Sequence, residues 1–83
     1  MSKITIRYFA AAAAAAGTEQ ETWERPETLA QLRTQLIDTH GNEMAQVLRA
    51  GSFLVNGVVR RDAGELGPTG ELTVDVLPPF AGG

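Results

Sequence analysis

The chain contains no cysteine among its 83 residues. Without a thiol it can form no disulfide, thiolate metal site or iron–sulfur cluster, and it has no cysteine nucleophile. Histidine is nearly absent as well, since His40 is the single copy. We therefore expect no metal or cofactor to be bound by this chain. If the protein handles sulfur, it does not carry it as a side-chain persulfide.

Long apolar runs and an excess of positive charge are also missing. The alanine run within residues 10–16 is too short and too weakly apolar for a signal peptide or a membrane-spanning helix, so a cytoplasmic location is the default expectation. The net charge of −3 and the pI of about 4.9 make nucleic acid and anionic membranes poor partners. A chain of this length predicts one domain with little room for a deep catalytic cleft.

Both ends of the chain carry strand patterns. Residues 3–9 and 72–77 alternate between apolar and polar side chains, which is typical of strands with one buried face. The residues expected on the core face are Ile4, Ile6, Tyr8, Leu72, Val74 and Val76. Phe9 falls on the opposite face, near the end of the first strand.

A weaker strand and a hairpin complete the expected sheet. Half of residues 19–24 are glutamates, which suits an edge strand, and Trp23 is expected to cover one rim of the core. The Asn-Gly pair at positions 56–57 lies between apolar runs and predicts a type I′ turn, because both central residues of that turn take positive φ. A loop over residues 62–70 follows, with Leu66 pointing inward.

Helical signals occupy the remaining stretches. The alanine run ends at Gly17 and predicts a short connecting helix. Thr28 and Gln31 have the spacing of a capping box at the start of a longer helix. The apolar stripe of that helix comprises Leu29, Leu32, Leu36, Ile37, Met44, Val47 and Leu48. Gly41 interrupts this stripe, so we expect a break there, with His40 beside it as a surface or capping residue.

The order of these elements predicts an α+β fold with β-grasp (ubiquitin-like) topology. We expect a mixed sheet of about five strands, with the first and last strands parallel at its centre, and one main helix, broken near Gly41, packed on one face. Residues 1–78 should form this domain. Residues 79–83 should form a flexible, extended tail that ends in Gly-Gly.

The tail is the most distinctive stretch of the chain. Residues 77–80 are apolar and stiffened by two prolines, whereas Gly82 and Gly83 have no side chains. A semi-rigid arm with a thin end suits delivery of a terminal carboxylate into a narrow channel of another protein. The alternative is that Gly-Gly is an inert tail or a cloning remnant, and the tail alone leaves that open.

Candidate contact residues lie on the arm and on one sheet face. They are Pro78, Pro79, Phe80, Ala81, Phe9, Phe53 and Arg7, with Arg60 and Arg61 expected to extend the charged rim. An exposed apolar patch of this kind usually marks an interface. For Phe53, an ordinary core position is an equally open alternative. The scattered acids Asp62, Glu65, Glu71 and Asp75 are interpreted as a solvated face and not as a paired catalytic site.

Several motifs resemble the MoaD/ThiS family of ubiquitin-like sulfur carriers. They are residues 6–10, Gly17, the capped helix from Thr28, and residues 53–57, 70–72 and 77–83. Together they span almost the whole chain, and the Pro-Pro before the terminal Gly-Gly resembles the MoaD branch. The run at Ala11–Ala16 departs from the pattern, because many relatives carry charged or bulky residues there.

The resemblance implies a sulfur carrier subunit of molybdopterin synthase that is not an enzyme on its own. A ubiquitin-activating-like adenylyltransferase would adenylate Gly83 with ATP and magnesium, and a sulfur donor would convert it to a thiocarboxylate. The carrier would then dock on a MoaE-type large subunit in a heterotetramer. There Gly83, at the end of the thread formed with Gly82, would give its sulfur to cyclic pyranopterin monophosphate in molybdenum cofactor biosynthesis.

Three other functions stay open at this point. The same thiocarboxylate chemistry serves thiamin or cysteine synthesis in related carriers, a ubiquitin-like modifier would conjugate to lysines through Gly83, and a plain interaction domain would have an unreactive tail. Weak self-association of the free carrier through its apolar patch is a further expectation. The sequence does not indicate which activating enzyme or sulfur donor is used.

Overall fold

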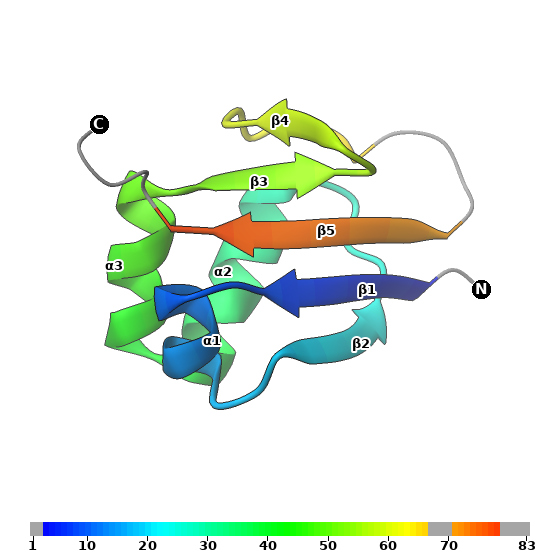
Figure 1. Cartoon of the computed structure of the whole chain (residues 1–83). Helices are drawn as coiled ribbons and strands as arrows, with labels where there is room; N and C mark the ends of the chain where they lie inside the picture. The colour runs from blue at the N-terminus through cyan, green and yellow to red at the C-terminus, as the bar shows by residue number, and fades with distance from the viewer. Residues whose placement is uncertain (1–2, 67–70, 79–83) are drawn as a thin grey trace.

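The computed structural model describes residues 3–66 and 71–78 (Figure 1). In chain order the elements are β1 (Lys3–Tyr8), α1 (Ala11–Ala16), β2 (Gln20–Glu24), α2 (Leu29–His40), α3 (Asn42–Ala50), β3 (Ser52–Val55), β4 (Val58–Arg60) and β5 (Leu72–Leu77). The strands form one sheet in the order β2-β1-β5-β3-β4. β1 and β5 run parallel, and the other neighbouring strands are antiparallel. This topology confirms the predicted β-grasp fold.

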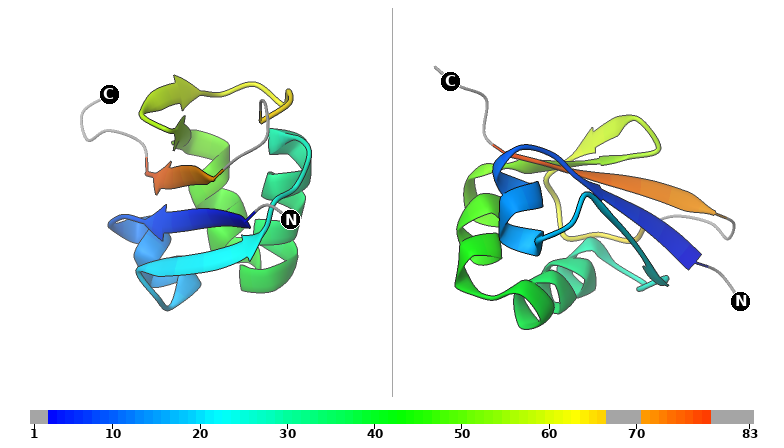
Figure 2. Two further views of the ribbon diagram at one scale, coloured as in Figure 1. Left: turned by 90° about the vertical axis from the view of Figure 1, so that its right-hand side faces the viewer. Right: turned by 60° about the horizontal axis from the view of Figure 1, so that its bottom comes forward.

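All three helices cover the same face of the sheet, and no part of the chain within residues 3–66 and 71–78 covers its other face (Figure 2). Alternate residues of the central strands point toward the helices, as the sequence pattern predicts. The largest fully buried side chains are Phe53, Ile4, Ile6, Leu29, Leu32, Leu36, Met44, Val74 and Val76. Leu66 points into this core from the loop before β5, as predicted. One apolar layer between sheet and helices therefore holds the fold together.

The helix break at Gly41 is confirmed. Gly41 has φ 85° and ψ −161°, a conformation that only glycine adopts readily, and it separates α2 from α3. At the other end of α2, the Thr28 hydroxyl accepts a hydrogen bond from the Gln31 amide at 3.1 Å. The side chain of Gln31 accepts from the Glu27 amide at 2.8 Å, whereas a capping box predicts the Thr28 amide. The predicted role of Thr28 as the cap is therefore confirmed. The bond back from the Gln31 side chain goes to the amide one residue earlier than a capping box predicts.

The alanine run forms the short helix α1, which ends at Gly17 in the predicted left-handed cap. The amide of Gly17 donates to the carbonyl of Ala13 at 2.9 Å. Ala12 is fully buried, since its small side chain lets α1 pack closely against the core. The run is therefore a packed connector between β1 and β2.

His40 is not a surface residue, contrary to expectation. Its side chain is only 9% exposed, its Nε2 lies 2.8 Å from Glu21 Oε1, and its ring stacks on Trp23 with centroids 6.3 Å apart. The Tyr8 hydroxyl donates to the same Glu21 Oε1 at 2.6 Å. Glu21 and Trp23 alternate on the helix-facing side of β2, so they reach the last turn of α2. Trp23 is partly buried at the rim of the core, as predicted.

Candidate functional site

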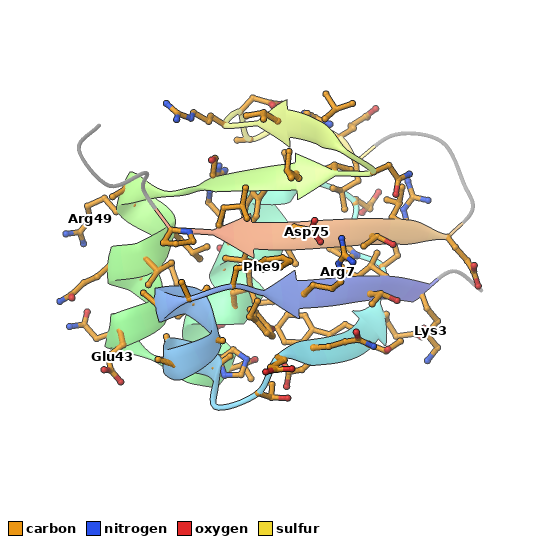
Figure 3. The ribbon with its side chains drawn as sticks, viewed as in Figure 1. Lys3, Arg7, Phe9, Glu43, Arg49 and Asp75 are labelled. Atoms are coloured by element: carbon orange, nitrogen blue, oxygen red, sulfur yellow. The ribbon has the colours of Figure 1, made fainter. Side chains whose placement is uncertain are left out.

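The candidate site is the uncovered sheet face, called the outer face below. The strand registers place on this face the side chains of Lys3, Thr5, Arg7, Gln20, Thr22, Glu24, Ser52, Leu54, Val59, Thr73, Asp75 and Leu77. Phe9 follows β1 on the same side. Figure 3 shows Arg7, Asp75 and Phe9 on this face, toward the viewer. β5 is the central strand of the sheet, so the arm that follows it starts from the end of the middle strand, beside α3.

An arginine and a carboxylate are paired at the centre of the outer face. The parallel register sets Arg7 opposite Asp75, with Nε 2.6 Å from Oδ1 and Nη2 2.8 Å from Oδ2. These hydrogen bonds with Asp75 raise the pKa of Arg7 above its ordinary value. Asp75 is only 8% exposed, so its placement on a solvated acidic face is wrong. The pair satisfies the carboxylate and leaves the guanidinium half in solvent.

Phe9 is the exposed aromatic residue of this face, as predicted. It is 41% exposed, and the guanidinium carbon of Arg7 lies 5.8 Å from its ring centroid. Its amide donates to the carbonyl of Val76 at 3.3 Å, which holds the backbone beside β5 after β1 has ended. An aromatic side chain with an arginine over its ring is a composition that protein interfaces favour.

The backbone where the arm leaves the sheet is fixed by close packing. Ser52 pairs with Leu77, and the preceding residue, Gly51, lies against the Leu77 carbonyl. A Cβ at Gly51 would stand 2.0 Å from Leu77 O and 2.9 Å from Val47 O. Pro78 follows directly and is half-buried. The last described residues of the arm therefore start from a defined position at the C-terminal end of α3.

The expectation that Phe53 lies on the exposed sheet face is wrong. Phe53 is 1% exposed, because it pairs with Val76 and shares that residue's helix-facing side of the sheet. The guanidinium of Arg33 on α2 lies 5.0 Å from its ring centroid and covers it. The alternative of an ordinary core position is confirmed.

Arg60 and Arg61 do not form one charged rim with Arg7. Arg60 pairs with Phe53 in the register and so faces the helix side, where its Nη2 lies 2.6 Å from Asp62 Oδ2. Arg61 borders a groove on that same side. The bonds from Arg60 and from the Gly64 amide lower the pKa of Asp62 below its usual range. Asp62 is therefore a structural partner within its loop.

The remaining predicted site residues are Pro79, Phe80, Ala81, Gly82 and Gly83, and all five lie outside the described residues. Sequence reasoning missed the apolar outer-face residues Leu54, Val59 and Leu77. Each alternates with a core-facing neighbour, and their shared face follows only from the registers of β3, β4 and β5. Val59, at 59% exposed, is the most open of them.

The described part of the chain has neither a cluster of metal ligands nor a membrane-spanning helix. Residues 3–66 and 71–78 contain no group of three or more His, Cys, Asp or Glu side chains arranged to hold a metal ion. The helices within those ranges include none that is long and apolar enough to span a membrane.

No protein-family model and no curated protein matches the chain. Solved structures are similar to it. A Haloferax volcanii protein aligns with a TM-score of 0.77 and 22% identity over 99% of this chain and 87% of that one. A candidate molybdopterin converting factor, subunit 1, from Pyrococcus furiosus aligns with a TM-score of 0.71 and 23% identity over 96% of this chain and 100% of that one.

Small archaeal modifier protein 1 from Methanosarcina acetivorans is also similar. It aligns with a TM-score of 0.73 and 21% identity over 100% of this chain and 98% of that one. Likeness at these identities establishes the fold, and each alignment spans nearly the full length of both chains. The chain therefore has the β-grasp fold of small ubiquitin-like proteins.

Proposed function

We propose that this protein is a cytoplasmic sulfur carrier that works through Gly83, as the small subunit of molybdopterin synthase. It is not an enzyme on its own: the adenylyltransferase supplies ATP and magnesium chemistry, and a MoaE-type large subunit supplies the catalytic groups. Membership of the MoaD/ThiS family is part of this proposal.

The observation that carries the proposal is the position of β5. It is the central strand, it ends beside the exposed Phe9, and its last residue is held against Gly51. An arm that starts at the end of the central strand, next to an interface-like face, is placed to enter a partner docked on that face. Residues 79–83 supply the apolar arm and the Gly-Gly end.

The proposed chemistry needs no side chain of this protein. A carboxylate oxygen of Gly83 attacks the α-phosphorus of ATP and releases pyrophosphate. A sulfur nucleophile then displaces AMP from the acyl carbon, and this leaves a thiocarboxylate. The absence of cysteine agrees with this route, because the sulfur is held by the terminal carbonyl carbon and not by a thiol.

The similar structures support the general class of this function. One is described as a candidate molybdopterin converting factor subunit, and others as small archaeal modifier proteins. Both descriptions fit a small β-grasp protein that acts through partners.

The test is the intact mass of the purified chain after incubation with an activating enzyme of the family, ATP, magnesium and sulfide. A gain equal to the replacement of one oxygen by sulfur, localised to Gly83, is expected. A chain with one residue added after Gly83 is the control, because that residue moves the reacting carbon by about 3.5 Å. An uncharged native chain, beside another carrier charged by the same enzyme, would contradict the proposal.

A second candidate function is a protein modifier conjugated to lysines through Gly83. The observation in its favour is that several similar structures are described as small archaeal modifier proteins. Isopeptide adducts ending in the Gly82–Gly83 remnant in a proteome digest would support it. Stable binding to a MoaE-type subunit, without such adducts, would favour the sulfur carrier.

A further inference from the structure

A groove on the helix side of the molecule is separate from the outer face. It lies where α2, α3 and the segment after β4 meet, and it has a volume of about 470 Å³. The residues that define this helix-side groove are Arg33, Ile37, Ala45, Leu48, Arg49 and Arg61. A volume of this order accommodates a few side chains of a ligand.

The three arginines of the helix-side groove have no carboxylate partner among the described residues. Arg33 donates to two backbone carbonyls, those of Asp62 at 2.9 Å and Arg61 at 3.3 Å. In the part of the chain that the structure describes, the side chains of Arg49 and Arg61 make no hydrogen bond or ion pair. Their charges are therefore available to an incoming anion.

Three basic residues elsewhere on the surface are paired with acids. Lys3 bonds Glu24 at 2.7 Å, Arg7 bonds Asp75, and Arg60 bonds Asp62. The chain as a whole carries a net charge of −3. Three unneutralised arginines at one groove of an acidic protein are a local reversal of charge, and such a reversal complements a negatively charged partner.

The wall between the arginines is aliphatic. Ile37 is 37% exposed, and Leu48 and Ala45 are half-buried beside it. Water in contact with these side chains is displaced when another aliphatic group covers them, which is favourable. The groove therefore matches a ligand that combines carboxylates with an aliphatic side chain.

A peptide fits this groove better than a nucleotide does. Among the described residues no aromatic ring borders the groove to stack on a base, since those that line it are arginine, aliphatic residues and glycine. We propose that the helix-side groove binds an acidic segment of a partner protein, with an aliphatic side chain held between carboxylates.

This second binding site leaves the outer face free. The helices lie on one side of the sheet and the outer face on the other (Figure 2), and Arg49 projects from the end of α3 (Figure 3). A partner bound to the helix side therefore does not cover Phe9 or the start of the arm. The inference does not depend on the proposed function of Gly83.

The test uses the full isotope-labelled chain and an acetylated, amidated peptide with one leucine between two pairs of aspartates. Titration followed by NMR should shift the amides of Ile37, Ala45, Arg49 and Arg61, with a Kd below about 1 mM. Added salt should weaken binding, because the contacts are between exposed charges. A peptide with lysines in place of the aspartates is the control and should produce no shifts at these amides.

Single substitutions test separately what the arginines and the aliphatic side chains of the groove contribute to binding. Arg49→Gln and Arg61→Gln should each weaken binding about threefold, as expected for exposed ion pairs. Lys3→Gln is the matched control: it also removes one positive charge, but at the start of β1, and binding should be unchanged. Ile37→Ser tests the aliphatic contact and should weaken binding at constant charge.

Several results would overturn the proposal. These are shifts confined to the outer face, equal binding of the lysine peptide, or the same loss of affinity in Lys3→Gln as in Arg49→Gln. Tighter binding of ADP than of the peptide at the same amides would assign the groove to small anions. Shifts of those amides that grow with protein concentration alone would assign it to a second copy of this chain.

Discussion

At the residue scale, Gly51 decides where the arm begins. Its φ of −91° is open to any residue, so its requirement is steric. A Cβ there would overlap the Leu77 carbonyl oxygen at 2.0 Å. The backbone of β5 approaches the end of α3 so closely that only a hydrogen atom fits between them.

We expect Gly51→Ala to lower the free energy of unfolding by about 1–3 kcal/mol, the usual cost of overpacking, and to shift the amide of Leu77. Urea unfolding and an NMR spectrum measure the two effects. Gly41→Ala is the control, because its φ of 85° is strained for alanine but nothing lies within 4 Å of the added Cβ. It should destabilise without moving Leu77. An unmoved Leu77 in Gly51→Ala would contradict the steric role.

Tyr8 is a second residue for which the structure predicts a measurable property, the ionisation of its hydroxyl group. Burial raises the pKa of its hydroxyl, and the hydrogen bond to Glu21 raises it further. The folded state therefore holds the phenol proton more tightly than the unfolded state does. The stability that follows is fully present below the ordinary pKa of about 10 and is lost as the pH rises above it.

Tyr8 is the only tyrosine, so tyrosinate absorbance reports on it alone. We expect the folded protein to show no tyrosinate signal with a midpoint near pH 10, and the signal to appear only as the protein unfolds in alkali. The same chain in denaturant should titrate with a midpoint near 10. A folded protein that ionises at that midpoint would show that Tyr8 is solvated.

At the element scale, the start of α2 shows how local signals set a boundary. Thr28 Oγ1 accepts from the Gln31 amide, and the first helical amide, that of Leu29, donates to the carbonyl of Gly64 at 2.8 Å. The second bond joins the helix start to the loop before β5. The cap therefore satisfies one amide from within the helix and one from a distant segment.

We expect Thr28→Ala to lower the free energy of unfolding by about 1 kcal/mol, through loss of the cap. Thr34→Ala is the matched control in the same helix, where the hydroxyl donates to the Ala30 carbonyl at 3.1 Å on the exposed face. That substitution should leave stability unchanged or raise it by up to about 0.5 kcal/mol, since alanine has the higher helix propensity. Urea unfolding measures the free energy of unfolding of both variants. Equal decreases in Thr28→Ala and Thr34→Ala would contradict the capping role of Thr28.

At the scale of the whole molecule, one layer of helices on a five-stranded sheet leaves the other side of the sheet open. The core is closed on the helix side, so the outer face is available to a partner without any loss of folding energy. Its aromatic residue, Phe9, stands next to the end of β5.

We expect Phe9→Ala to weaken binding to a MoaE-type subunit by about 1–2 kcal/mol, as truncation of an aromatic contact usually does. Val58→Ala is the control: Val58 is 61% exposed, but it pairs with Val55 and so lies on the helix-facing side of the edge strand β4. Its affinity should equal that of the native chain. Calorimetric titration measures both, and equal affinities for all three chains would place the interface elsewhere.

The sequence determined the elements of this protein, because the signals for them are local. Alternation gives β1 and β5, the Asn-Gly pair gives the turn before β4 with φ of 49° and 85°, and Gly41 divides the helix. These features depend on backbone sterics and on periods that neighbouring residues define. The order of the elements along the chain also predicted that the first and last strands pair in parallel, and β1 and β5 do so.

The tertiary structure decided what each side chain meets. The sequence left open whether Phe53 is exposed or part of the core, and only its register with Val76 shows that it is buried. Asp75 and His40 read as solvated residues, and their partners, Arg7 and Glu21, are remote in sequence. Pairing across strands and packing of a helix on a sheet are long-range contacts, so the outer face and the helix-side groove exist only once the chain is folded.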